Sequence, residues 1–245
     1  MDMRRRAETG IWGLYKMGGL TPAIAQMFGA QNAQQMAYIR SVMKAQRNKR
    51  LFGHRMDDLE VVVFDLETTG FSAYGGDEIL SIGAVLVKGG VVQKEKTFYT
   101  LVNPKRDIPS KIVELTGISE EMVVGAPDII DALSDFLDYV GERVLIAHGT
   151  GHDRHFLNAA LWRTSRVSLE HRMLDTMMIT KWLYPQQKDL SLDTLLEMHH
   201  IPIQNRHHAL EDALMTADLW VDYHRRMREK DIHTLGDLYT KLSNR

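Results

Sequence analysis

The stretch Val61-Val62-Val63-Phe64-Asp65-Leu66-Glu67 decides the interpretation of this chain. Its four apolar residues are typical of a buried strand, and Asp65 and Glu67 stand where that run ends. Side chains two residues apart on a strand point to the same face, so both carboxylates should be directed at one place. Like charges held together repel, and a divalent cation with oxygen ligands would stabilise them. The tripeptide Asp-Leu-Glu is also common at solvated strand ends. Alone, it does not distinguish a metal site from such an end.

Two further Asp-bearing segments strengthen the metal interpretation. Residues 148–153 (HGTGHD) follow an apolar run at 144–147 and begin a helical pattern. Residues 207–212 (HHALED) begin a long helix after a loop that contains proline. Together with the first pair, these segments supply four carboxylates and a histidine. That inventory suits hydrolysis of a phosphodiester by two divalent cations, with a histidine that takes a proton from water.

The order of these motifs resembles that of the DEDDh 3′–5′ exonucleases, which include the proofreading epsilon subunit of bacterial DNA polymerase III. Residues 64–70 (FDLETTG) resemble the first motif of that family, and residues 207–213 (HHALEDA) resemble the third. Residues 115–118 (LTGI) resemble the loop that follows its hairpin region. Three motifs in the same order are more specific than any one of them.

The resemblance implies a role for each matching residue. The metal ligands would be Asp65, Glu67, Asp153 and Asp212, with His207 as the general base of the catalytic group. The cofactor would be Mg²⁺ or Mn²⁺, two ions per site, with Asp65 bridging them and Asp153 supporting the second directly or through water. The residues that border the terminal nucleotide would be Leu66, Thr68, Leu115 and Thr116.

The second motif departs from the family pattern, which usually reads His-Asn-Ala-x-Phe-Asp. Gly149 stands in place of the asparagine, and His152 stands in place of the aromatic residue. Glycine permits a different turn between strand and helix. The departure leaves open how Asp153 is placed and how tightly the second cation is held.

Two adjacent histidines compete for the role of general base. Residues four apart on a helix share a face, which would pair His208 with Asp212. The resemblance selects His207 instead, and this agrees with the geometry if His207 lies in the loop just before the helix. We expect His207 to be the base, and His208 to be exposed or to lie behind the ligands.

The pattern along the chain predicts an α/β protein. Strands are expected at residues 59–66, 79–87, 91–101, 144–147 and 172–176, and helices at 110–115, 119–123, 128–140, 153–162, 192–198 and 208–226. The resemblance implies the ribonuclease-H-like exonuclease fold, a five-stranded mixed sheet flanked by helices. We expect a basic helical N-terminal extension at 1–57, an exonuclease domain at 58–228 and a C-terminal tail at 229–245.

Charge is divided unevenly between the extension and the rest. Residues 1–50 carry nine Lys or Arg and two acidic residues, a charge of +7, which leaves −9 for the remainder of a chain whose net charge is −2. A basic segment of this kind suits a polyanion, and a solvated basic helix is the alternative. Apolar residues at helical spacing, among them Met36, Ile39 and Met43, favour packing on the domain or self-association. A polymerase or another protein partner is the alternative.

The chain has no cysteine, which excludes disulfides and thiolate metal sites. It shows no apolar stretch of membrane length and no signal-peptide core, so we expect a cytoplasmic protein without a membrane partner.

The resemblance implies a metal-dependent exonuclease that releases 5′-mononucleotides from the 3′ end of single-stranded or frayed DNA. One alternative is an RNA 3′-end trimming enzyme of the same family. Another is a non-catalytic module of the same fold that binds nucleic acid or a polymerase. The converging carboxylates argue against a non-catalytic module, because binding alone does not require like charges to be buried close together.

Overall fold

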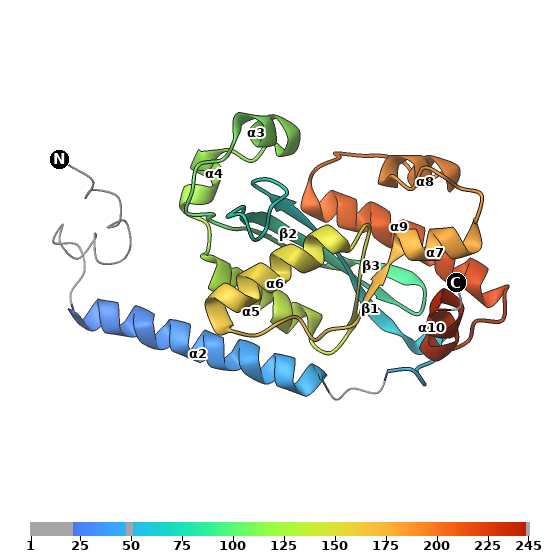
Figure 1. Cartoon of the computed structure of the whole chain (residues 1–245), viewed down its shortest axis with the longest axis horizontal. Coiled ribbons are helices and arrows are strands. Elements are labelled where there is room, and N and C mark those ends of the chain that lie inside the picture. Colours follow the sequence, from blue (N-terminus) through green and yellow to red (C-terminus); the bar gives the residue numbers. More distant parts are fainter. Residues whose placement is uncertain (1–21, 48–50, 244–245) are drawn as a thin grey trace.

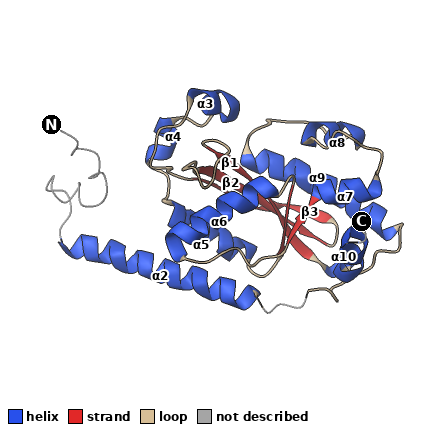
Figure 2. Ribbon diagram, in the orientation of Figure 1, coloured by secondary structure: helices blue, strands red, loops and turns tan. Residues whose placement is uncertain are grey.

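The structure is a computed structural model that describes residues 22–47 and 51–243, with side chains described from residue 29 onward (Figures 1 and 2). Helices cover both faces of a central sheet, as the predicted α/β architecture requires. In chain order the elements are α2 (Pro22–Gln46), η1 (Met56–Asp58), β1 (Glu60–Thr68), β2 (Ile79–Lys88), β3 (Val91–Leu101), α3 (Ser110–Thr116), α4 (Glu120–Val124), α5 (Ile129–Val140), β4 (Val144–Ala147), α6 (Gly151–Ser165), β5 (Met173–Asp175), α7 (Thr176–Leu183), α8 (Leu192–Met198), α9 (Ala209–Arg228) and α10 (Leu235–Ser243).

The sheet has five strands in the order β3-β2-β1-β4-β5. β1 pairs antiparallel with β2, and β2 pairs antiparallel with β3. β1 pairs parallel with β4, and β4 pairs parallel with β5. The β2–β3 hairpin turns at Gly89 and Gly90, whose φ angles of +54° and +74° favour glycine. This arrangement confirms the predicted mixed sheet of five strands.

Strand β1 separates two hydrophobic cores by the alternation of its side chains. Val62, Phe64 and Leu66 belong to the core that α5 and α6 cover. Val61 and Val63 belong to the core that α9 covers. Asp65 and Glu67 continue the second series, so β1 directs both carboxylates to the face of the sheet where α9 lies.

Gly83 of β2 sets how closely α9 approaches the sheet. It pairs with Asp65 across the two strands. A Cβ atom at this position would lie 2.2 Å from the backbone nitrogen of Leu210, in the first turn of α9. Only glycine accommodates a helix backbone at that distance. The start of α9 therefore lies directly beside the acidic end of β1.

The N-terminal helix α2 packs on α5 and α6 of the domain (Figure 1). Ile39 and Met43 are buried in the first core. The Arg40 side chain donates to the carbonyl of Ser165 at 2.9 Å, and that of Gln46 donates to the carbonyl of Gly141 at 3.0 Å. These contacts confirm the expected packing on the domain. The remainder of the basic extension, residues 1–21 and 48–50, lies outside the described residues.

Two helices were absent from the sequence prediction. α7 follows β5 without a break, and α10 lies inside the segment expected to be a tail. Leu235, Leu238 and Leu242 of α10 belong to the same core as α9. Because both terminal segments share the cores of the domain, the boundaries at 57 and 228 stay a prediction. None of the helices in the described part of the chain is long and apolar enough to cross a membrane.

Candidate active site

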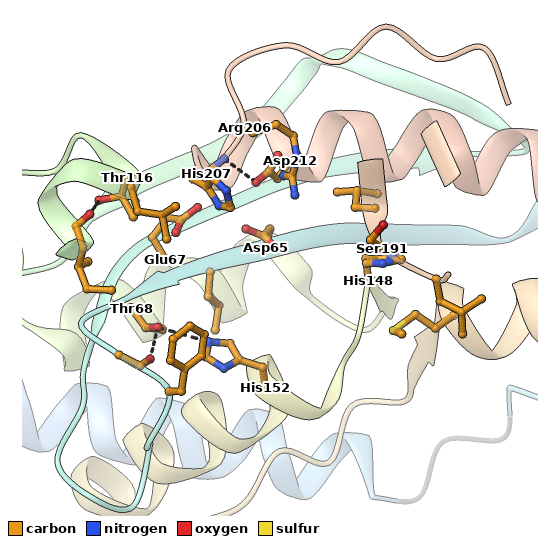
Figure 3. A pocket seen from close by; sticks show the side chains of 18 of the residues that line it. Asp65, Glu67, Thr68, Thr116, His148, His152, Ser191, Arg206, His207 and Asp212 are labelled. Atoms are coloured by element: carbon orange, nitrogen blue, oxygen red, sulfur yellow. Dashed lines mark hydrogen bonds and ion pairs between the residues drawn. The ribbon is translucent and has the colours of Figure 1, made fainter. Parts of the chain in front are cut away.

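A pocket of about 620 Å³ opens at the carboxyl end of β1, beside the start of α9 (Figure 3). Eight of the nine site residues expected from the sequence line it: Asp65, Leu66, Glu67, Thr68, Leu115, Thr116, His207 and Asp212. The ninth, Asp153, is buried behind the pocket wall with 3 % of its surface exposed. A volume of this size is typical of pockets for small ligands.

Glu67, His207 and Asp212 form the tightest group in the pocket. Ligand atoms from the three side chains lie within 4.8 Å of one another, close enough to hold one metal ion. Only 8 % of Glu67 and 4 % of Asp212 is exposed. Strand β1 supplies the first residue and the first turn of α9 supplies the last, so the close approach at Gly83 brings them together.

His207 lies in the loop before α9, as its predicted role requires, and not on the helix itself. Its φ angle of +63° is in the left-handed region, which costs energy for a residue with a side chain. The strained conformation lets its backbone N–H donate to Asp212 Oδ2 at 3.0 Å. His208 is the residue before the first turn, and its ring stacks on Tyr99 with centroids 4.7 Å apart. The structure therefore places the two neighbouring histidines in different environments.

Burial, with the charges of neighbouring carboxylates, raises the pKa values of three acidic residues at this site. Burial raises the pKa of Asp65 well above its ordinary value, and the charges of Asp153, Glu67 and Asp212 act in the same direction. Burial also raises the pKa of Glu67 to about 7, with a further contribution from Asp212. The pKa of Asp153 rises to about 8, mainly through burial. Holding several buried carboxylates close together costs free energy unless a cation neutralises them. Carboxylate oxygens are the ligands that a divalent cation prefers, so the residues present fit such an ion.

Arg206 was not expected from the sequence, and it is the cation nearest to this acidic group among the described residues that line the pocket. Its guanidinium forms an ion pair with Asp212 Oδ1, and its Nε lies 2.5 Å from Asp193 Oδ1. It opposes the rise in the pKa of Asp65 and of Glu67. Arg206 thus compensates part of the negative charge that a metal ion would neutralise.

The turn that lacks the family's asparagine is ordered by a carboxylate from another strand. Asp175 at the end of β5 accepts hydrogen bonds from the backbone N–H of Gly149 at 3.1 Å and of Thr150 at 3.0 Å. Gly149 has a φ angle of +73°, which explains why glycine occupies that position. Asp153 follows in the first turn of α6, near enough to Asp65 to raise its pKa.

His152 and Phe71 form the wall beside Thr68. The Nε2 atom of His152 lies 3.3 Å from Thr68 Oγ1, which itself donates to the carbonyl of Gly70 at 2.7 Å. Because the Thr68 proton is directed at Gly70, the histidine is the donor of the pair. The Phe71 ring meets the His152 ring edge-on and is 85 % exposed. An exposed ring on a pocket wall offers a surface on which a base can stack.

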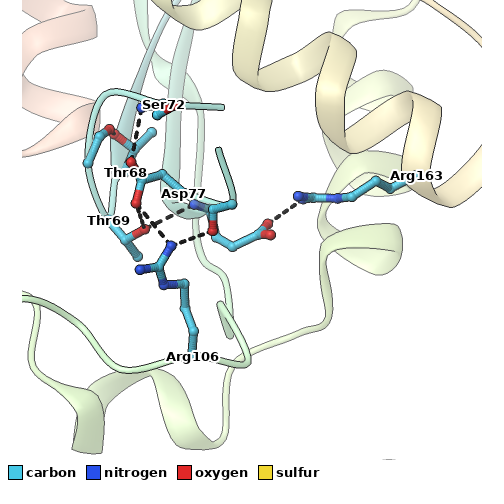
Figure 4. A network of polar contacts seen from close by, with 9 residues as sticks. Thr68, Thr69, Ser72, Asp77, Arg106 and Arg163 are labelled. Carbon is cyan, nitrogen blue, oxygen red and sulfur yellow. Dashed lines mark hydrogen bonds and ion pairs between the residues drawn. The ribbon is translucent and has the colours of Figure 1, made fainter. Parts of the chain in front are cut away.

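A polar network fixes the turn that follows Thr68, between β1 and β2 (Figure 4). Asp77 accepts hydrogen bonds from the Thr69 hydroxyl at 3.2 Å and from the Ser72 backbone N–H at 3.0 Å. Arg106, on the loop after β3, lies 3.0 Å from the same carboxylate. These contacts connect the turn to the loop that precedes α3, so both sides of the pocket are held by one network.

Comparisons with known proteins agree with this geometry. Residues 62–220 match the exonuclease family RNase_T. The chain is 40 % identical over 189 residues to "DNA polymerase III PolC-type" of Clostridium perfringens, covering 76 % of this chain and 13 % of that protein. It is 33 % identical over 182 residues to "3'-5' exonuclease DinG" of Staphylococcus epidermidis, covering 74 % of this chain and 20 % of that protein. The chain therefore spans less than a third of the length of these relatives.

A solved structure confirms the fold prediction. The nuclease domain of 3'hExo, described as a DEDDh family member bound to rAMP, superposes with a TM-score of 0.60 and 21 % identity. The match covers 70 % of this chain and 92 % of that one. At this identity the likeness establishes the ribonuclease-H-like fold, and the family match at residues 62–220 carries the classification. The predicted exonuclease class is confirmed, and the chain belongs to the exonuclease family.

Proposed function

We propose that this protein is a metal-dependent 3′–5′ exonuclease that releases 5′-mononucleotides from the 3′ end of single-stranded or frayed DNA. The observation that carries the proposal is the convergence of Glu67, His207 and Asp212, with Asp65 beside them, in one pocket. The relatives named as a DNA polymerase and a 3′–5′ exonuclease support DNA as the substrate and the direction of degradation. Mg²⁺ or Mn²⁺ suits a site made of carboxylates and one histidine.

The residues of the pocket divide into three tasks. Asp65, Glu67 and Asp212 would bind the cations, and Asp153 would support the second cation directly or through water. When bound, two divalent cations would promote ionisation of the attacking water and stabilise the leaving oxygen. His207 would take the proton from that water at a ring nitrogen.

The remaining lining residues would bind the terminal nucleotide. Leu66, Thr68, Leu115 and Thr116 all line the pocket. The exposed ring of Phe71 would stack on a base, and Lys188 on the rim would attract a phosphate. A polymerase or other protein as the partner of the N-terminal segment stays a prediction, as does a cytoplasmic location.

Degradation of end-labelled strands tests this function. A single strand of DNA labelled at its 5′ end, and an RNA of the same sequence, are incubated with the protein and Mg²⁺ or Mn²⁺. We expect a ladder of labelled products that shortens one nucleotide at a time, faster on DNA. An internal cleavage pattern would exclude the proposed polarity, and faster RNA degradation would favour the RNA-trimming alternative. Binding of both strands without cleavage would favour a non-catalytic module.

Replacing Arg206 by Gln should tighten Mn²⁺ binding by about tenfold, equivalent to roughly 1.4 kcal/mol. The guanidinium contacts the Asp212 oxygen that a cation would use, so metal and arginine compete for it. Isothermal titration calorimetry gives the two affinities directly. Arg163→Gln is the matched control, because it removes an ion pair with Glu78 outside the pocket. Equal Mn²⁺ affinity in wild type and Arg206→Gln would contradict competition.

The metal-free protein should lose thermal stability as the pH rises from about 5 to 8.5. The pKa values of Glu67 and Asp153, about 7 and about 8, lie above those of the same groups in an unfolded chain. The folded state therefore binds more protons in this window, and its stability falls until both groups ionise. Scanning calorimetry in EDTA measures the decline, and saturating Mn²⁺ should raise Tm more at pH 8 than at pH 6. A Tm in EDTA that rises across the window would contradict the assignment.

A further inference from the structure

A second cavity, of about 380 Å³, lies outside the active site and is lined by arginines from three segments of the chain. Arg47 follows α2, Arg154 lies on α6, and Arg172 precedes β5. Tyr239 of α10 and one carboxylate, Glu170, also line it. We call this cavity the basic pocket. It is a concentration of positive charge in a chain whose net charge is −2.

Two of the three guanidinium groups have no carboxylate partner among the described residues. Arg47 forms an ion pair with Glu170 at 2.7 Å, but no such pair involves Arg154 or Arg172 within residues 22–47 and 51–243. Arg172 is held in place by aromatic rings, since its guanidinium lies 4.2 Å from the centre of the Phe52 ring. Stacking of this kind fixes the orientation of an arginine, and Arg172 also forms a hydrogen bond with the Tyr239 side chain.

Tyr239, Arg154 and Arg172 all line the same cavity. Burial raises the pKa of the Tyr239 phenol, while Arg172 and Arg154 each act in the opposite direction. Both guanidinium groups therefore lie close enough to stabilise negative charge on an oxygen at that point. A group with several anionic oxygens, such as a phosphodiester, matches two guanidinium groups better than a single carboxylate does.

The basic pocket and the active site lie on opposite sides of the first turn of helix α6. His152 lines the active-site pocket, and Arg154 lines the basic pocket. Two residues along a helix differ in direction by about 200°, which accounts for the separation. To reach Arg154, a strand whose 3′ end occupies the active site would pass around the first turn of α6.

We propose that the basic pocket binds a phosphodiester of the nucleic-acid strand upstream of its 3′ end. This inference rests on the proposed exonuclease function, because that function supplies the strand. The pocket would hold longer strands more tightly than short ones through a contact that is independent of sequence. A free phosphate or mononucleotide offers the same anionic oxygens and is the other source of this ligand chemistry.

Binding measurements on strands of increasing length test the proposal. Fluorescence anisotropy is recorded for labelled oligothymidylates of 4 to 30 nucleotides at several KCl concentrations. The full chain carries Asp65→Asn so that the strand stays intact. Adding Arg154→Gln should weaken binding of the longest strand by about fivefold and reduce the salt slope by about 0.7, the value for one phosphate contact on a single strand. The shortest strand should bind equally to both proteins.

The control and a second ligand separate the possible outcomes. Arg163→Gln lies on the same helix outside the basic pocket and should leave affinity and salt slope unchanged. Equal affinity and slope for Arg154→Gln on every length would overturn the proposal while leaving the exonuclease function intact. Loss of thermal stabilisation by inorganic phosphate alone, with strand binding unchanged, would assign the pocket to a free anion and also overturn it. If neither protein binds any strand, the proposed function fails and the inference fails with it.

Discussion

Replacement of Asp65 by Asn is expected to lower kcat by at least about 10³-fold while the protein stays folded. Asp65 is the carboxylate whose charge interacts with Glu67, Asp153 and Asp212 alike, so it is best placed to share two cations. Cations at such a site contribute several kcal/mol of charge stabilisation in the transition state, and each 1.36 kcal/mol corresponds to a factor of ten. Turnover is measured on a 5′-labelled strand with saturating Mn²⁺.

Stability gives this substitution a second readout with a definite sign. Asn has nearly the shape of Asp but removes a buried like charge, so Tm in EDTA should rise. Stabilisation by Mn²⁺ should shrink at the same time. Asp218→Asn is the control, because it removes a half-buried carboxylate of α9 that does not line the pocket. A folded Asp65→Asn protein with wild-type turnover would exclude the proposed use of metal ions.

Replacement of His207 by Ala is expected to lower kcat by about 10² to 10⁴-fold, the usual contribution of a general base. The side chain lies within reach of both Glu67 and Asp212, where the attacking water would be held. Turnover and KM on a 5′-labelled strand with saturating Mn²⁺ measure this change, and the loss should appear in kcat more than in KM.

The adjacent histidine provides the matched control for that experiment. His208 stacks on Tyr99, so His208→Ala should change stability more than kcat. Near-normal turnover in His207→Ala would overturn its assignment. A larger catalytic loss in His208→Ala than in His207→Ala would transfer the role to the neighbour.

Short-range patterns predicted the acidic face correctly. The period of two along β1 placed Asp65 and Glu67 on one side, and the structure puts α9 on that side. Helix spacing pairs His208 with Asp212, whereas the family resemblance selects His207. The two agree only if His207 lies in the loop before the helix, which is where the structure places it. Each of these inferences needed only the geometry of one strand or one helix start.

The residues that the sequence did not reveal act through contacts between distant segments. Arg206 reaches Asp212 because a strained turn reverses the chain before α9, and no pattern of residue types signals that turn. Asp175 orders the turn at Gly149 from another strand, across 26 positions of sequence. Sequence periodicity carries no information on such pairings, which depend on how strands are ordered in the sheet.

One omission was avoidable, because the start of α10 carries a recognisable signal. Thr234 and Asp237 exchange hydrogen bonds between side chain and backbone, which is the pattern of a capping box. The apolar residues Leu235, Leu238 and Leu242 follow at helical spacing. A signal of this kind predicts a helix in the segment that was expected to be a C-terminal tail.

The acidic residues of the candidate site lie far apart in sequence, so the site exists only when distant segments meet. Its parts lie on β1 and at the start of α9, and they meet only where the helix backbone rests on Gly83. A local opening of that first turn would disperse the ligands while leaving most of the sheet intact. Hydrogen exchange at the amides of the α9 start should therefore report when the protein is competent to cut, well before global unfolding sets in.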